Sequence, residues 1–479
     1  MSRLGALLIT VALAGCAGSS SYRSPTPPID AAFVNAGATS SNAQAPGADI
    51  ASFWRGFDDA ALSQLVERAL AANGDVRVAQ ARLQEARATL QGADAELLPN
   101  VGAQANASRS LSPEYQFPGT TRDQRTGNVF DARFTASWEL DLFGRNRRAR
   151  EAAAAQLDAS QAGVHAARTS VAAEVARNYL ELRGLQQRLE VARQSIANQR
   201  DSLRLTEVRL DAGRGTRLDV ARARSQLDGT EASLPALQAA IDRAAFRLAT
   251  LSAQPPRSVS AELATPKLLP TLPVTDLAAL PIGTPEQLLR RRPDLVAAER
   301  QLAAATANVG VATADSFPRI SLSGLIGLAS TRLSLLGQGD SQQYSLGAGL
   351  TWPLFDFGRV RSRIAASDAR AQQALASYEQ AVAVALEETE GALTQFTRTA
   401  QQAGRLASAA FNAEDAERLA RLRFDAGAID FVVVLDAQRQ TLAARDALVQ
   451  AQVGQATSLV SVYRALGGGW SEAAVAAMR

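Results

Sequence analysis

Residues Phe130 to Arg145 read FDARFTASWELDLFGR, and this stretch decides which fold the chain can adopt. Apolar residues occupy every second position from Phe130 to Leu142, and charged or hydroxyl residues occupy the positions between them. A period of two places the apolar set on one face of a β-strand and the polar set on the other. The strand runs through Gly144 into a long proline-free stretch with helical periodicity. We therefore expect a strand of a barrel wall that continues directly into an unusually long helix.

The composition of the chain restricts the classes of function that it can have. The chain has 479 residues, enough for two or three domains, and a formal net charge of +3. Because this charge is small and the arginines are scattered along helices, we expect no nucleic-acid partner. The single His165 stands in a helix, no acid–base or nucleophile motif accompanies it in the sequence, and Gly467–Gly469 does not open a long helix as a phosphate loop would. We therefore predict that the protein is not an enzyme and needs no cofactor and no metal.

The first residues resemble a secretion signal. A positive start, Met1-Ser-Arg3, precedes an apolar run that is too short to span a membrane and ends in Leu-Ala-Gly-Cys16. This ending resembles the bacterial lipoprotein cleavage box, which implies removal of residues 1–15, lipidation of Cys16 and, with Ala17 following, sorting to the outer membrane. The alternative is an ordinary signal with a chance cysteine. No later segment is apolar enough for a membrane helix, so any span of the membrane has to be built from β-strands.

The chain contains an internal repeat, which we infer from short motifs that recur at fixed distances. The distance between matching motifs is 219 residues before the hairpin loop and 214 residues after it, so the difference in length falls in that loop, where insertions are tolerated. Chance similarity between Ala- and Arg-rich helices is the alternative, but it does not explain two kinds of motif in one register. Asp294, Leu302 and Pro318 lie 219 residues after Asp75, Leu83 and Pro99, whereas Trp352, Gly358 and Arg359 lie 214 residues after Trp138, Gly144 and Arg145. Arg-Phe-Asp-Ala-Gly at 423–427 also lies 214 residues after Arg-Leu-Asp-Ala-Gly at 209–213.

Each repeat carries one predicted β-hairpin, at 100–143 and 319–356. The strands have roughly the 9–11 residues that a tilted transmembrane strand needs. Aromatic residues gather where the strands meet the helices, which favours a girdle at the contact between lipid and water. The alternative is that they form the core of a soluble sandwich. The aromatic residues near these junctions include Trp138, Phe143, Trp352 and Phe355.

The long helices show the spacing of a coiled coil. Val175, Leu182 and Leu189 are separated by seven residues, and Ile196, Leu203 and Leu210 continue the series. One apolar seam therefore faces a partner helix along its length. In each repeat one shorter helix precedes the hairpin and another follows the long helix. Laid end to end, these two shorter helices would supply the antiparallel partner of the long one.

These patterns predict a mainly α fold with a transmembrane β-barrel and long antiparallel coiled-coil helices that form an α-barrel. Four strands cannot close a barrel, and an open sheet edge in lipid leaves backbone groups unpaired. Two copies would give a barrel filled by its own side chains, whereas three would share a twelve-stranded barrel wide enough for a channel. We therefore expect a homotrimer. The predicted segments are a signal peptide 1–15, a lipidated arm 16–57, a first repeat 58–252 with its coiled-coil helices at 144–252, a proline-rich connector 253–283, a second repeat 284–466 with its coiled-coil helices at 357–466, and a tail 467–479.

Four motifs carry a resemblance to a known family: Arg291-Arg-Pro-Asp-Leu295, Trp352-Pro-Leu-Phe-Asp-Phe-Gly-Arg359, Leu435-Asp-Ala-Gln438 and Tyr463-Arg-Ala-Leu-Gly-Gly-Gly-Trp470. With them, nearly all of the mature chain resembles a TolC-like outer-membrane efflux factor of the OprM/NodT lipoprotein branch. This resemblance implies an exit duct in the outer membrane of a Gram-negative bacterium, with a helical tunnel in the periplasm. It also implies a periplasmic membrane-fusion adaptor and an inner-membrane pump, most simply of the RND type, as partners for the efflux of drugs or other small molecules.

The same resemblance implies a periplasmic gate, an iris at the turns between the coiled-coil helices. Acids of the family's iris match Asp436 and Asp219, and Val433 stands where some relatives carry a second acid. Phe424 and Ile429 replace a Tyr and an Arg that latch the tip in the best-known member, so that latch cannot be copied here. An exposed turn charge is the alternative for each charged candidate. Other candidates nearby are Asp430, Arg214, Arg217 and Arg222, and Gly213 and Gly427 suit left-handed helix ends.

Three other interpretations remain open at this point: a duct for protein secretion, a duct for metal ions and a structural lipoprotein. An exit duct for type I protein secretion would use the same parts, and a metal duct would lack soft ligands, because Met478 is the only methionine after Met1. A structural coiled-coil lipoprotein belongs to another class and would explain the heptads but not the amphipathic strands. The sequence does not name the cargo, the pump or the adaptor.

Overall fold

The structure, a computed structural model, describes residues 22–26, 28–34, 50–277, 280 and 282–468. The lipidation candidate Cys16 and the predicted signal segment lie outside the described residues. So do much of the predicted arm and most of the predicted tail.

The chain divides into two compact units. Unit 1 contains Met1–Thr26, Leu83–Ser160 and Ala298–Tyr378, and unit 2 contains Pro27–Arg82, Gln161–Ala297 and Glu379–Arg479. Each unit therefore takes segments from both halves of the sequence.

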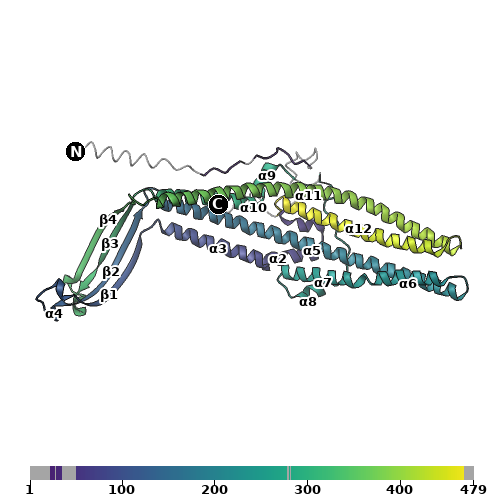
Figure 1. Ribbon diagram of the computed structural model, residues 1–479, viewed down its shortest axis with the longest axis horizontal. Coiled ribbons are helices and arrows are strands. Elements are labelled where there is room, and N and C mark those ends of the chain that lie inside the picture. The colour runs from purple at the N-terminus through teal and green to yellow at the C-terminus, as the bar shows by residue number, and fades with distance from the viewer. Residues whose placement is uncertain (1–21, 27, 35–49, 278–279, 281, 469–479) are drawn as a thin grey trace. The chain divides into compact units, whose positions relative to one another are not determined.

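Unit 1 is built around one antiparallel sheet with the strand order β1-β2-β3-β4 (Figure 1). Its strands are β1 (Asn100–Leu111), β2 (Thr126–Leu140), β3 (Arg319–Ser330) and β4 (Gln342–Thr351). The short helix α4 (Arg122–Arg125) lies in the loop of the first hairpin. Pairing of β2 with β3 joins the two hairpins. Among the described strands, β1 and β4 each have a partner on one side only.

The register of the sheet places the apolar residues of neighbouring strands on one face. Phe134 pairs with Ile326, which pairs with Tyr344, and Trp138 pairs with Leu322. This face is not covered within the protomer, since Tyr344 is 87% exposed and Ile326 is 64% exposed. A soluble sheet buries its apolar face, so the environment of this one lies outside the protomer.

The junctions between strands and helices are built alike in the two halves. The indole Nε1 of Trp138 donates to the Leu97 carbonyl at 3.0 Å, and that of Trp352 donates to the Ser316 carbonyl at 3.1 Å. Both carbonyls lie just beyond the end of a 22-residue helix, which is α3 (Gly74–Ala95) in the first half and α10 (Pro293–Ala314) in the second. These tryptophans therefore fix each hairpin to the helix that precedes it.

An aspartate just before each of the two longest helices caps its first turn. These helices are α5 (Arg145–Asp211) and α11 (Arg359–Asp425), and both have 67 residues. Asp141 accepts hydrogen bonds from the backbone N–H groups of Asn146 and Arg147 at 3.1 and 2.8 Å. Asp356 accepts from the N–H groups of Gly358 and Val360, and these bonds hold the pKa of its carboxyl below the ordinary value. Caps of this kind satisfy backbone donors that the first helical turn leaves free.

Unit 2 is helical. Besides parts of α5 and α11 it contains η2 (Ile50–Phe57), α2 (Ala60–Ala72), α6 (Arg217–Glu231), α7 (Leu234–Leu251), α8 (Pro256–Leu263), α9 (Pro285–Arg291) and α12 (Phe431–Ala465). Its main core includes Leu62, Tyr179, Leu248, Phe396 and Leu459, each at most 1% exposed. The predicted heptad residues Val175, Leu182, Leu189 and Ile196 are buried.

One expected helix is interrupted. The periodicity over 216–251 predicts a single helix, but the structure has two, α6 and α7, separated at Ala232–Ser233. Pro235 explains the break, because proline lacks the N–H of a helical hydrogen bond and clashes with the preceding turn. The predicted connector also contains the short helix α8, which begins at Pro256.

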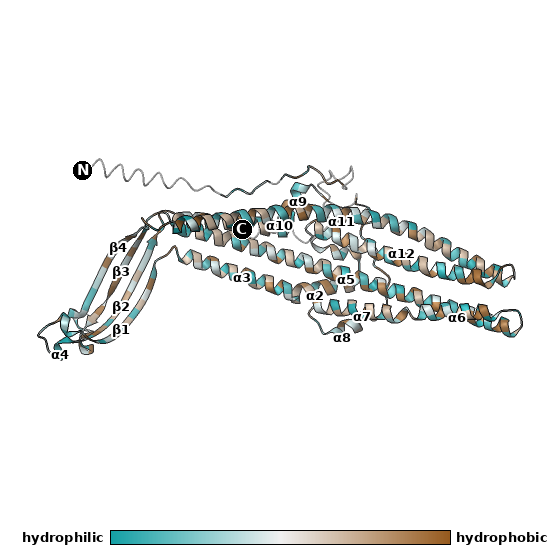
Figure 2. Cartoon of the chain, viewed as in Figure 1, coloured by the Kyte–Doolittle hydropathy of each residue, from teal (hydrophilic) through white to brown (hydrophobic). Residues whose placement is uncertain are grey.

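No helix in the described part of the chain is both long enough and apolar enough to cross a membrane. Hydrophilic and hydrophobic residues are interspersed along the helices in Figure 2.

Candidate functional site

The candidate site lies in unit 2, at the two turns that connect the coiled-coil helices. Gly213 has a φ of +69° and Gly427 a φ of +73°, the left-handed region that glycine enters without strain. Around them the N–H of Arg214 donates to the Arg209 carbonyl and that of Ala428 to the Arg423 carbonyl, at 2.8 and 2.9 Å. The two turns thus end α5 and α11 with the same backbone motif.

A small apolar cluster supports the turns. Phe424 and Phe431 lie with ring centroids 5.2 Å apart, and Val434, Leu435, Ala223 and Ala420 complete the buried part. The guanidinium of Arg209 lies over the Phe424 ring at 4.3 Å from its centroid. Ile429 packs against the same cluster. The two residues that replace the family's latch therefore have a packing role in this protomer.

Asp436 is held by its own helix. Its carboxylate forms an ion pair with Arg439, and it accepts a hydrogen bond from Gln440 Nε2 at 2.6 Å. Both partners are exposed residues one turn further along α12. The charge of Asp436 is thus partly balanced before any neighbouring copy is considered.

Asp219 has a local structural task. Its Oδ2 accepts from the backbone N–H of Thr216 at 3.2 Å and from the Thr216 hydroxyl at 2.6 Å, and the Thr216 hydroxyl accepts from the Asp219 N–H. This reciprocal arrangement is a capping box at the start of α6. Asp430 is the N-terminal cap residue of α12 but makes no capping side-chain hydrogen bond, and Val433 in the next turn is exposed.

The candidate arginines are solvent-exposed. Within the described residues, neither Arg217 nor Arg222 makes a side-chain hydrogen bond or ion pair, whereas Arg224 pairs with Glu207 at 2.8 Å. Arg217 and Arg224 also line an open cleft along α6, beside Leu210 of α5. The structure therefore leaves two of the predicted cations available to a partner.

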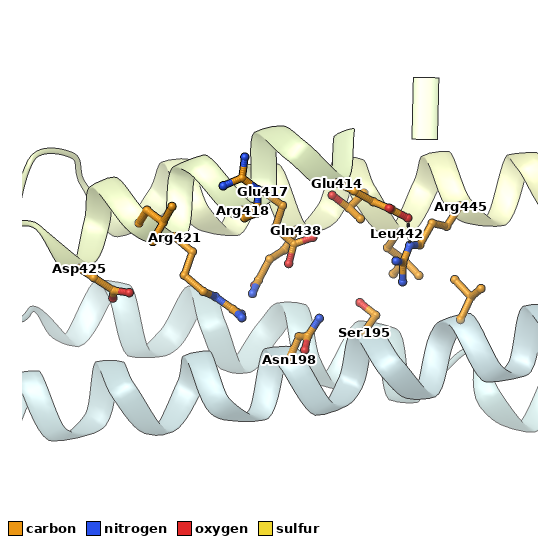
Figure 3. Close-up of a pocket in the computed structure, with 13 residues that line it drawn as sticks. Ser195, Asn198, Glu414, Glu417, Arg418, Arg421, Asp425, Gln438, Leu442 and Arg445 are labelled. Carbon is orange, nitrogen blue, oxygen red and sulfur yellow. Dashed lines mark hydrogen bonds and ion pairs between the residues drawn. The ribbon is translucent and has the colours of Figure 1, made fainter. Parts of the chain in front are cut away.

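A second, charged cleft of about 320 Å³ lies between α5 and the α11–α12 pair. Arg421, Gln438 and Arg445 extend from that pair towards α5 (Figure 3). Gln438 is buried and donates from Nε2 to the Ser202 hydroxyl at 2.9 Å, but its Oε1 has no hydrogen-bond partner among the described residues. Arg445 pairs with Glu414 across the two helices. This cleft was not predicted from the sequence, because its lining comes from residues more than 200 positions apart.

Two buried arginines were also missed by the sequence reasoning. Arg292 donates to Asp294 Oδ2 at 2.7 Å and to Glu388 Oε2 at 2.8 Å, which ties the start of α10 to α11. Arg183 is 1% exposed, donates to the Thr265 carbonyl at 3.0 Å and lies over the Tyr179 ring. The signal for Arg292 was the quoted Arg-Arg-Pro-Asp motif, but Arg183 stands in a helix without any local sign of burial.

The predicted girdle aromatics all belong to unit 1. Trp138 and Trp352 are partly exposed and make the indole hydrogen bonds described above. Phe143 stacks on Phe317 with the ring centroids 4.9 Å apart, whereas Phe355 is almost fully exposed.

Comparison with known proteins identifies the family. The family described as "Outer membrane efflux protein" matches residues 65–254 and 284–468. The chain belongs to this family. It is 33% identical to the outer membrane protein OprJ of Pseudomonas aeruginosa over 98% of this chain and 96% of OprJ. It is 34% identical to the pyoverdine export outer membrane protein OpmQ of P. aeruginosa, over 88% of each chain.

The solved outer-membrane channel OprN superimposes with a TM-score of 0.87 and 42% identity, covering 95% of this chain and all of that structure. The predicted fold class, with long coiled-coil helices, four strands per protomer and an internal repeat, is confirmed. The protein is an outer-membrane efflux channel, so its predicted location and its assignment as a non-enzyme are confirmed as well.

Proposed function

We propose that three copies of this outer membrane efflux protein form the exit duct of a tripartite efflux system. The observation that carries this proposal is the four-stranded sheet, whose edge strands β1 and β4 lack a second partner among the described strands while its apolar face is exposed. In lipid each unpaired backbone group costs several kcal/mol, so the edges need strands from identical neighbours.

The polar face of the sheet fits a water-filled interior. On β2 this face carries Arg133, Thr135, Ser137 and Glu139. Two copies would supply eight strands, whose interior is filled by side chains, and three would supply twelve. A trimer is the smallest ring with room for cargo.

The duct works with a periplasmic membrane-fusion adaptor and an inner-membrane pump, most simply of the RND type. The cargo is a small organic molecule, as the name of the relative OpmQ favours. The duct lets this cargo pass without binding it as a substrate. Lipid on Cys16 would anchor each protomer to the outer membrane.

The periplasmic turns form the gate. In a trimer three copies of Asp436 would surround the axis and form a ring that attracts cations. The exposed ion pairs near these turns are weak: Glu207–Arg224 joins α5 to α6, Asp436–Arg439 lies within α12, and such pairs contribute about 0–1 kcal/mol each. Adaptor contacts at these turns therefore need to supply only a modest shift in population to open the gate.

The assembly is tested with the mature protein purified in detergent. We expect a mass of three protomers by light scattering and ion conduction in planar bilayers. A monomer that stays folded without detergent and does not conduct would refute the duct and favour the structural coiled-coil lipoprotein. Reconstitution with a protein-exporting ATPase instead of a drug pump would favour the type I secretion alternative.

The gate is tested by Asp436→Ala, which should raise single-channel conductance because, in this proposal, the ring of acids and its ion pairs hold the tip closed. Asp201→Ala is a matched control, since Asp201 is an exposed acid of α5 without a side-chain partner among the described residues. An unchanged closed level in Asp436→Ala would exclude this residue from the gate. Equal changes in both variants would point to a general charge effect.

A further inference from the structure

The segment between β4 and α11 exposes an unusual combination of side chains. Leu354 is 64% exposed, Phe355 91% and Phe357 100%. Arg359 and Arg361 follow directly and are also exposed. We call these five residues the junction surface, and all of them belong to unit 1. Along the chain the surface changes from apolar to cationic within eight residues.

The backbone of Phe357 is held in an unfavourable conformation. Its φ is +54°, a region that a bulky residue other than glycine rarely enters. Phe143, at the equivalent position of the first repeat, instead stacks on Phe317. The second repeat therefore keeps a strained aromatic residue that packs against no side chain in the described part of the chain. Strain of this kind persists where the surroundings or the function require it.

The two arginines are also placed against local preference. They begin α11, whose first turn contains no acid, although the positive end of the helix dipole disfavours cations. Asp356 attracts Arg359, but its oxygens already cap two backbone N–H groups. Arg361 makes no side-chain hydrogen bond or ion pair with the described residues.

The equivalent arginines of the first repeat are compensated. Arg145 pairs with Asp315 at 3.4 Å and Arg147 pairs with Asp141 at 3.3 Å. Asp315 is in turn shared with Arg319 and with Arg363 of α11, so it cannot neutralise further cations. Of the arginines at the starts of α5 and α11, only the first two of α11 therefore lack an ion-pair partner among the described residues, and they lie beside the exposed aromatic residues.

We propose that the junction surface binds phospholipids of the leaflet that faces the helices, with Arg359 and Arg361 on the phosphate groups. Arginine suits this task because its planar fork of N–H groups matches phosphate oxygens. Phenylalanine and leucine beside it would lie at the boundary of the acyl chains, as apolar side chains do next to basic ones at a membrane surface. The strain at Phe357 and the cations at a helix start are then compensated by lipid. This inference rests on the proposed function, since it needs the sheet to lie in a bilayer.

The test uses the full-length protein, purified in detergent and depleted of lipid, with binding followed by native mass spectrometry. The probes are dioleoylphosphatidylglycerol, dioleoylglycerol, which has the same chains but no phosphate, and inorganic phosphate. We expect the phospholipid to bind and the other two to bind at least about tenfold more weakly. The double variant Arg359→Gln/Arg361→Gln should weaken phospholipid binding by about tenfold.

The matched control is Arg193→Gln/Arg405→Gln. Both of these arginines are exposed on the long helices without a side-chain partner among the described residues, so the change in charge is the same. The control should bind phospholipid like the wild type. Equal loss in both double variants would overturn the inference, because it would reduce the effect to net charge.

Other results would overturn the inference in favour of another occupant. Full competition by inorganic phosphate would indicate a site for free anions. Another result would make a second copy of the chain the occupant. In that case Glu96→Gln, which removes an exposed acid just before β1, would weaken the trimer as much as the arginine variant does, and added lipid would change neither effect. A change of ion selectivity with unchanged lipid binding would place the arginines in the water-filled interior. Conductance of the wild type separates the two proposals. If the wild type conducts but the arginine variant binds phospholipid equally well, only this inference is refuted and the duct stands.

Discussion

Replacement of Gly184 by alanine should destabilise the protein because two helices touch at this residue. Gly184 is buried on α5, and an added Cβ would lie 2.1 Å from Cγ2 and 3.4 Å from Cβ of Val453 on α12. Valine in a helix strongly prefers one rotamer, so its methyl group cannot rotate away at low cost. The helices therefore have to separate, or the valine has to adopt a poor rotamer.

Two opposing effects decide the size of the change. Alanine in a helix interior is more favourable than glycine by about 0.5–1 kcal/mol. Overpacking of a buried contact costs about 1–3 kcal/mol. We expect a net loss of about 1–2 kcal/mol in the free energy of unfolding, and a loss of 1.4 kcal/mol is tenfold in an equilibrium constant. Gly404→Ala on α11 is the control, because nothing lies within 4 Å of its added Cβ, and it should be neutral or stabilising.

The assay is unfolding of the purified protein in guanidinium chloride, followed by helical circular dichroism. Gly184→Ala, Val453→Ala and the double variant form a cycle in which the second change removes the clash made by the first. The double variant should therefore be more stable than the sum of the single changes predicts, by about 1–3 kcal/mol. If Gly184→Ala were as stable as Gly404→Ala, or if the cycle were additive, the close contact would not limit packing and the reasoning would be refuted.

Two further predictions follow from buried and half-buried charged groups. Arg292→Met should lower the free energy of unfolding by about 1–3 kcal/mol, because Asp294 and Glu388 lose the charged hydrogen-bond donor that they share, whereas Arg405→Met should change it little; equal midpoints in guanidinium chloride would contradict this. Burial, and secondarily Arg168, lowers the pKa of His165 below its ordinary value of 6.5. The unfolded chain therefore takes up a proton first as the pH falls, so stability is retained above pH 6.5 and decreases as the pH falls from there through the folded-state pKa. His165→Asn should flatten this decrease between roughly pH 7 and 5, and parallel curves for both proteins would disprove the assignment.

Much of this architecture could be predicted because it depends on local periodicity. Alternation along 130–142 predicts β2, heptads from Val175 onward predict the coiled coil, and glycine at 213 and 427 predicts left-handed helix ends. The recurrence of Trp138 as Trp352 predicts equivalent junctions, and their indole groups make equivalent hydrogen bonds. The interruption between α6 and α7 was missed although Pro235 was visible, because periodicity on both sides of it is helical.

The candidate site was less accessible to sequence reasoning. Asp219 was chosen as a gate acid, but its carboxylate caps α6 through Thr216, a role that the spacing of the two residues could have indicated. Asp436 pairs with Arg439 three positions further along α12, which the helical spacing could also have indicated. The charged cleft lined by Arg421 and Arg445 joins distant segments.

By itself the sequence determined which segments are strands and helices, where the chain repeats and where the long helices end, since these depend on side-chain period and on residues such as glycine whose preferences act within a few positions. Only the tertiary structure decided which of many similar arginines are buried, as Arg183 and Arg292 are, and which glycine admits a neighbouring helix, as Gly184 does. Burial and close approach depend on what lies opposite a residue in space. A contact such as that between Arg188 and Asp446 joins positions that have no fixed relation along the chain.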